Sequence, residues 1–348
     1  MGESSVKVKQ THISVLDGWR AVSILLVLFG HWFPMPRVTQ INGMAGAAGM
    51  ALFFALSGFL ITRMLLQDQQ ILPFLVRRVF RILPLAWAAM LILIVTTGAS
   101  TDVAFTNLLF ISNLPPAKLM YGGEHLWSLC VEMQFYFGVA VLVGLGGRRA
   151  LYLLPLGALA VTAARIGASE TISIYTYHRI DEIMAGSTVA LIVHHIPTTR
   201  ERAPLPNWLP IILFLTLLVC SHEAAGALQY VRPYAAGATV LCSIYAAPSL
   251  FKEALQTRPA RYIAEISYAL YVIHGMLTVT WLGGQDAPKL VQYALRLPLT
   301  IVTFGLAHLS TFHYERYWMT MGRNLSGRLK GRRGPPPLGE RTSDKGAV

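Results

Sequence analysis

Charged residues are scarce in this chain. Only 13% of its 348 residues are Asp, Glu, Lys or Arg and 54% are hydrophobic, whereas soluble domains carry about 25% charged residues. This excludes a soluble enzyme or binding module and is typical of a protein that crosses a membrane several times. Cysteine is scarce too. Cys130, Cys220 and Cys242 all lie in apolar segments without metal-ligand spacing, so we expect neither a disulfide framework nor a metal site.

Acidic residues are also few, with 17 Asp and Glu against 29 Lys and Arg, which gives a formal charge of +12. A basic balance of this size can indicate nucleic-acid binding. Here most basic residues fall in short loops between apolar runs, which is the positive-inside pattern of membrane proteins. We therefore assign the charge to membrane topology and expect no nucleic-acid partner.

Apolar runs of spanning length recur along the chain and predict an all-α, polytopic membrane bundle of about ten transmembrane helices. The alternation of basic loops places both termini in the cytoplasm. We expect a cytoplasmic segment over 1–13, the membrane domain over 14–321, and a disordered basic cytoplasmic tail over 322–348. The expected spans lie at about 14–33, 44–66, 84–95, 126–145, 151–164, 178–195, 208–220, 234–250, 262–282 and 291–312.

The first apolar run, LDGWRAVSILLVLFGHWFP, contains Asp17, Arg20 and His31. Each buried charge in such a helix costs about 2.5 to 3.5 kcal/mol, so a simple anchor or a cleaved signal peptide would not carry them. Arg20 and His31 lie eleven positions apart, on one helical face and roughly 16 Å apart along the axis. The structural alternative is an Asp17–Arg20 pair at the interface, with His31 in headgroup water.

A second cluster follows the second span, in FLVRRVFRILPLAW. Arg77, Arg78 and Arg81 fall on one helical face, which predicts a short interfacial helix that ends where Pro84 restarts the third span. Guanidinium groups bind phosphate bidentately, so the cluster suits a phosphate-bearing ligand. Ordinary positive-inside residues are the alternative.

Five blocks now form a set: LDGWRAVSILLVLFGH, ALFFALSGFLIT, FLVRRVFRILPLAW, HLWSLCVEMQFYF and ISYALYVIHGM. In sequence and order they resemble the signatures of the acyltransferase-3 family of integral membrane O-acyltransferases, over residues 14–320. The resemblance implies that an acyl group moves from acyl-CoA to a hydroxyl. Met133 stands where the family commonly has a second Glu. The family's activity-linked residues are an Arg and a His on the first helix, an Arg-x-x-Arg motif and a Glu, which here are Arg20, His31, Arg78, Arg81 and Glu132.

The expected chemistry gives these residues roles. His31 is the predicted base, because an imidazole can take the proton of the acceptor hydroxyl near neutral pH. Its second nitrogen needs a partner, for which Glu132 is preferred over Asp181. Arg20 is expected to line the path of the pantetheine arm. Coenzyme A phosphates are expected to bind Arg77, Arg78 and Arg81.

Four further residues are candidate acceptor contacts: Ser128, Arg179, Asp181 and His274. Ser128 shares a helical face with Glu132, although capping of the helix start is the preferred explanation. Arg179 and Asp181 pair with each other or contact the acceptor. His274 is an imidazole inside a span, which indicates either a site or a hydrogen bond to a neighbouring helix.

We expect an O-acyltransferase in the cytoplasmic membrane of a bacterium. It would move an acyl group, acetyl in the simplest case, from acyl-CoA to a cell-surface or lipid-linked carbohydrate. Two alternatives stay open: acylation of a secondary metabolite such as a macrolide sugar, and transport of a glycan precursor or acyl carrier, which inward-facing Arg, His and Glu would also serve. No fused soluble domain is expected after the tenth span, so transfer is completed alone or with a separate partner.

Overall fold

The computed structural model describes residues 12–33, 35–36, 39–196 and 204–331. Regular structure in these residues is helical, apart from one isolated bridge between Leu205 and Ala246. The α-helices are α1 (Val15–Trp32), α2 (Ile41–Gln67), α3 (Ile71–Thr97), α4 (Thr101–Leu108), α5 (Trp127–Gly146), α6 (Leu154–Gly167), α7 (Asp181–His195), α8 (Leu209–Ser221), α9 (Arg232–Tyr245), α10 (Leu250–Ala254), α11 (Arg258–Thr278), α12 (Lys289–Leu309) and α13 (Arg316–Gly331).

Each predicted span coincides with one of these helices, namely α1, α2, α3, α5, α6, α7, α8, α9, α11 or α12. The all-helical class is confirmed, and apolar helices of spanning length support a membrane protein. The count of ten spans and the cytoplasmic termini stay predictions. Within the described residues, five helical stretches are long and apolar enough to cross a membrane: Val15–Trp32, Ile41–Gln67, Ile71–Thr97, Glu124–Gly167 and Lys289–Lys330.

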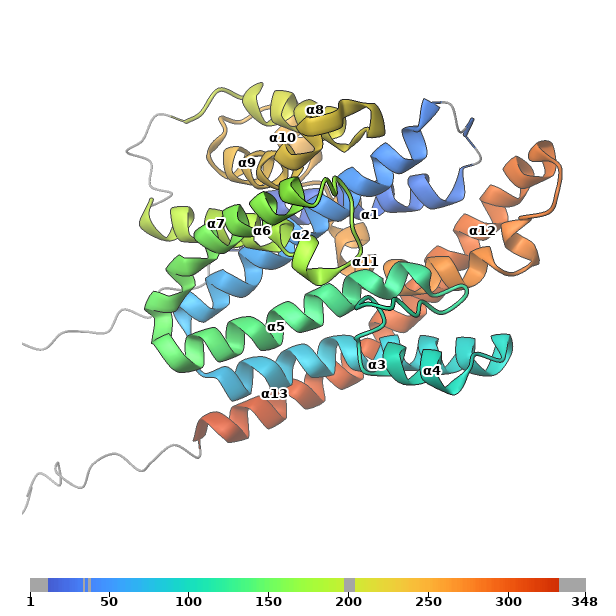
Figure 1. The fold of residues 1–348 in the computed structure, drawn as a ribbon, viewed down its shortest axis with the longest axis horizontal. Helices are drawn as coiled ribbons and strands as arrows, with labels where there is room; N and C mark the ends of the chain where they lie inside the picture. The colour runs from blue at the N-terminus through green and yellow to red at the C-terminus, as the bar shows by residue number, and fades with distance from the viewer. Residues whose placement is uncertain (1–11, 34, 37–38, 197–203, 332–348) are drawn as a thin grey trace, which may run out of the picture.

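α2 lies at the centre of the bundle, against α1, α7, α8 and α9 (Figure 1). It crosses α7 with backbone in contact with backbone. A Cβ on Gly58 would lie 1.8 Å from the carbonyl oxygen of Ile183, and one on Gly186 would lie 1.9 Å from that of Ala55. Small residues permit this approach, which is the usual way for helices to associate in a membrane.

α3 is one continuous helix that contains Pro84, so the separate interfacial helix expected over 73–83 is not formed. Proline removes one intrahelical hydrogen bond, which a membrane helix tolerates where neighbours satisfy the freed polar groups. The carbonyl that loses its intrahelical donor is that of Phe80, and close to it the hydroxyls of Tyr268 and Tyr314 donate to the carbonyls of Ile82 (2.6 Å) and Pro84 (3.2 Å), which ties this part of α3 to its neighbours.

The tail differs from expectation at its start. Residues 322–331 are helical and end α13, which lies beside α3 at the lower edge of Figure 1. Ser326 is buried and accepts a hydrogen bond from Arg77 Nη1 at 2.7 Å, and Lys330 pairs with Asp68. Polar contacts to α3 and to Asp68 at the end of α2 thus order a stretch that is too polar to fold by itself. The remainder of the expected disordered tail, 332–348, lies outside the described residues.

Candidate active site

A cavity of about 320 Å³ opens where α1, α2 and α3 meet. The Arg78 guanidinium is held there by the rings of Phe74 and Tyr136, whose centres lie 5.9 and 5.8 Å from it. Three further arginines line the same cavity, and several guanidinium groups together suit a phosphate-bearing ligand. Sequence reasoning did not single out Arg63, although it directly follows the LSGFLIT run. We call this space the four-arginine cavity, after the arginines that line it: Arg20, Arg63, Arg78 and Arg81.

Arg77 is not part of this cavity. It lies on a different side of α3 and donates a hydrogen bond to Ser326 of α13. Neighbouring helical residues point about 100° apart, so Arg77 and Arg78 cannot share one face. The structure thereby corrects the expected three-arginine cluster to Arg78 and Arg81, joined by Arg20 and Arg63.

Glu132 lies on α5 in a narrow space that it shares with Arg20, Arg78 and Arg81. Its buried carboxylate accepts hydrogen bonds from Ser57 Oγ at 2.5 Å and from the Tyr136 hydroxyl. The expected contact with His31 is therefore not formed, because Glu132 belongs to the arginine side of the bundle. Tyr136, one turn after Glu132 in the same sequence block, was not among the predicted site residues.

His31 near the end of α1 is held by His274 of α11 instead. His31 Nδ1 lies 2.8 Å from His274 Nε2, and His274 Nδ1 lies 2.6 Å from the Tyr271 carbonyl oxygen. A carbonyl only accepts, so His274 carries a proton on Nδ1; in the neutral ring its Nε2 then accepts from the Nδ1–H of His31. This chain leaves the Nε2 lone pair of His31 unprotonated, as a general base requires.

His31 separates two cavities. The Arg179 cavity, about 370 Å³, is lined by Asn42, Trp127 and Arg179 among others. The Arg296 cavity, about 410 Å³, is lined by Glu124, Gln292 and Arg296 among others. His31 and His125 line both. The His125 ring lies directly on the backbone of α11, where a Cβ on Gly275 would come within 2.2 Å of it.

A row of cavities lies between the four-arginine cavity and His31, and neighbouring cavities share lining residues. The space around Glu132, about 30 Å³, shares Arg20, Phe53 and Ser267 with a second small space of about 10 Å³. That second space shares Met50 and Tyr271 with the Arg179 cavity. Arg20 lines the first three of the four cavities, so it lies along the route expected from the sequence.

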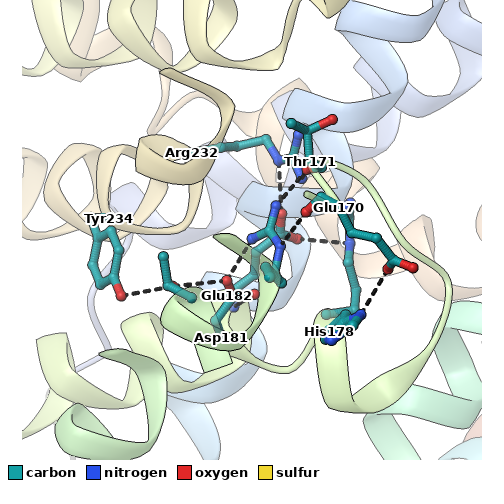
Figure 2. A network of polar contacts seen from close by, with 10 residues as sticks. Glu170, Thr171, His178, Asp181, Glu182, Arg232 and Tyr234 are labelled. Atoms are coloured by element: carbon teal, nitrogen blue, oxygen red, sulfur yellow. Dashed lines mark hydrogen bonds and ion pairs between the residues drawn. The ribbon is translucent and has the colours of Figure 1, made fainter. Parts of the chain in front are cut away.

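Asp181 does not line the two cavities beside His31. It pairs with Arg165 of α6, Oδ2 to Nη1 at 2.6 Å, and both side chains are 0% exposed. Arg179 pairs with Glu182 at 3.3 Å, and Glu182 also binds Arg232 Nε at 2.9 Å. The expected alternatives for Asp181, a bond to Arg179, to His31 or to the acceptor, are thus replaced by a partner that sequence reasoning missed. Figure 2 shows these charges gathered around the loop between α6 and α7.

The same arginines fix that loop. Arg165 Nη2 and Arg232 Nη2 both donate to the carbonyl of Thr171, at 2.5 and 3.2 Å (Figure 2). At the edge of the network His178 donates to Glu170 at 2.7 Å, a hydrogen bond that lowers the pKa of the Glu170 carboxyl. The next residues after Thr171, 172–174, form one wall of the Arg179 cavity.

Ser128 lies behind this site. It is fully buried and lies 2.5 Å from the Tyr271 hydroxyl, which donates to the His125 carbonyl. Ser128 therefore donates to Tyr271, whose side chain lines the Arg179 cavity. It does not itself line either cavity next to His31.

Comparisons with known proteins identify the family of the chain. A family described as "Acyltransferase domain" matches residues 13–312. The chain belongs to the acyltransferase-3 family. The expected family is thereby confirmed, and the motif blocks that suggested it all fall within the matched residues. No solved structure matches the chain.

Relatives are distant and mostly longer. "Putative peptidoglycan O-acetyltransferase YrhL" of Bacillus subtilis is 26% identical over 91% of this chain and 57% of its own length. "Nodulation protein 10" of Rhizobium leguminosarum is 25% identical over 78% of this chain and 86% of its own length. "Putative O-acetyltransferase SACOL0978" of Staphylococcus aureus is 27% identical over 39% of this chain and 25% of its own length. The chain thus spans little more than half of the first of these relatives and a quarter of the last.

Proposed function

We propose that this protein is an O-acetyltransferase of the bacterial cytoplasmic membrane that moves acetyl from acetyl-CoA to a hydroxyl of a surface or lipid-linked carbohydrate. The observation that carries the proposal is the row of cavities between the arginines and His31. It offers one end for an anionic donor and another end for a base beside two open cavities. The names of the relatives support O-acetylation, and one of them refers to a glycan.

The donor end is the four-arginine cavity. Coenzyme A carries a diphosphate and a 3′-phosphate, and guanidinium forks bind such groups with charge-assisted hydrogen bonds. The pantetheine arm would follow the cavities past Glu132, where the two small spaces of about 30 and 10 Å³ would have to widen around it, and bring the thioester to His31. Arg20 and His31 are roughly 16 Å apart along α1, a span that an extended arm of this kind covers.

The transfer step uses His31 as base. His31 Nε2 takes the proton of the acceptor hydroxyl as its oxygen attacks the thioester carbonyl carbon. The carbon–sulfur bond then breaks, the acetyl group stays on the acceptor oxygen, and the coenzyme A sulfur leaves with the proton from His31. His274 holds His31 in the tautomer that this step needs.

Donor binding can be tested with a matched pair of arginines. We expect Arg78→Gln with Arg81→Gln to weaken acetyl-CoA binding by about tenfold or more, because each charge-assisted hydrogen bond contributes about 1.5–3 kcal/mol. Arg77→Gln on the same helix should leave the affinity unchanged, since Arg77 binds Ser326 outside the cavity. Calorimetric titration of the purified protein measures both. Equal affinities in all variants would return the arginines to a topological role and favour the transport alternative.

The side of the membrane can be tested at Gly43, an exposed residue that lines the Arg179 cavity. We expect Gly43→Cys, with Cys130, Cys220 and Cys242 replaced, to react with an impermeant thiol reagent on intact cells, because the positive-inside pattern places His31 in the outer half. Labelling only after the membrane is opened would invert the topology. A surface glycan with unchanged mass in cells lacking the gene, beside an acylated small molecule, would favour the secondary-metabolite alternative.

A further inference from the structure

The buried charges around the loop between α6 and α7 do not balance. Arg165, Arg179 and Arg232 carry three positive charges, while Asp181 and Glu182 carry two negative ones, and all five side chains are at most 3% exposed. The difference among these buried groups is one positive charge; Glu170, the further carboxylate of the network, is 38% exposed and is engaged by His178. Burial of an uncompensated charge is costly, so such a site favours a ligand of opposite sign.

Arg179 is where this excess charge meets a cavity. Arg165 and Arg232 are each engaged by a carboxylate and by the Thr171 carbonyl. The Nε of Arg179 faces Glu182 at 3.3 Å without a hydrogen bond, and within the described residues it has no other hydrogen-bond partner. The guanidinium lies over the Trp127 ring, 5.4 Å from its centre, which fixes its direction. Arg179 thus lines the same cavity as His31.

We infer that the Arg179 cavity binds an anionic group of the acceptor, a carboxylate or a phosphate, and so presents a hydroxyl of that acceptor to His31. The inference rests on the proposed function and deepens it by naming the acceptor class. Among the described residues that line the cavity there is no carboxylate to compete with the ligand. Ile172, Ile174 and Trp127 make part of its walls apolar, and an ion pair is stronger beside apolar surface than in bulk water.

The fold explains why Arg179 can be held ready for a ligand. If Arg179 is removed, Glu182 keeps its bond to Arg232, and the buried charges become two of each sign. Arg179→Gln should therefore fold, unlike a change that leaves the buried carboxylate of Asp181 or Glu182 without a counter-ion. This makes Arg179 testable separately from the stability of the network.

The test uses two oligosaccharides that differ only in charge: one that ends in a hexuronate and its neutral uronamide. We expect calorimetry on the purified wild-type protein to show about tenfold to hundredfold tighter binding of the uronate, which corresponds to an arginine–carboxylate interaction. Arg179→Gln should abolish that preference, Arg179→Lys should retain part of it, and Arg296→Gln in the opposite cavity should retain all of it.

Three results would overturn the inference: no charge preference in the wild type, a preference that survives Arg179→Gln, or one that disappears only in Arg296→Gln. A fourth result would also count against it: the wild type prefers the uronate, but Arg179→Gln loses turnover equally on both sugars. That pattern belongs to a residue that stabilises the reaction itself. Acetyl transfer from acetyl-CoA to the same sugars, followed by mass spectrometry, reports separately on the proposed function.

Discussion

His31→Ala is expected to reduce acetyl transfer by about 10²- to 10⁴-fold, the usual contribution of a positioned general base. The variant keeps α1 intact, because the backbone around His31 is anchored by Asn42, which donates to the carbonyls of Gly30 (2.9 Å) and Phe33 (2.7 Å). Membrane abundance and acetyl-CoA affinity should therefore be unchanged. Transfer rates on purified protein in detergent, measured by release of free coenzyme A thiol, give the result.

The control for this prediction is another imidazole on a predicted span. His308 of α12 is exposed and contacts Tyr262, away from the cavities beside His31. His308→Ala should transfer acetyl at the wild-type rate. His274→Ala should cause a smaller loss than His31→Ala, seen in kcat with KM for acetyl-CoA unchanged, because it frees the His31 tautomer without removing the base. A well-expressed His31→Ala protein with near-normal turnover would remove His31 from the mechanism.

The helices could be predicted because apolar periodicity and length act locally. Every expected span falls on a helix. The errors lie where a neighbour far along the chain decides the outcome. The sequence predicts a helix break at Pro84, yet α3 continues through it, with the hydroxyls of Tyr268 and Tyr314 bonded to nearby carbonyls. The sequence predicts disorder at the start of the tail, yet this stretch is helical, because Arg77, 249 positions earlier, donates a hydrogen bond to Ser326.

The candidate site was predicted by residue type better than by pairing. His31, Arg20, Arg78 and Arg81 line the connected cavities. The partner of His31 was misassigned, because helical phase gives the face of a residue on its own helix but not its depth against another helix. Glu132 thus lies beside the arginines, and the imidazole of His274 on α11, in place of a carboxylate, lies beside His31. Arg165, which lies within an apolar run, has no signal that reveals its partner Asp181.

The buried pair of Arg165 and Asp181 carries the second large effect. We expect Arg165→Gln to lower the free energy of unfolding by about 3–5 kcal/mol, because the Asp181 carboxylate would stay buried without its counter-ion. Thr162 Oγ1 and the backbone N–H of Glu182 still donate to Asp181, at 3.1 and 3.0 Å, but neither supplies a charge. Thermal unfolding in detergent, followed by tryptophan fluorescence, would show this as a clearly lower Tm.

An exposed pair provides the comparison. Lys118 and Asp102 are 2.7 Å apart, with side chains 36% and 53% exposed, and such pairs contribute about 0–1 kcal/mol. Lys118→Gln should therefore leave the Tm nearly unchanged, and equal shifts in the two variants would contradict the argument from burial. Replacing both Arg165 and Asp181 by apolar residues should recover much of the lost stability. It should not recover transfer, because the bond from Arg165 to the Thr171 carbonyl, which holds the loop beside His31, would still be missing.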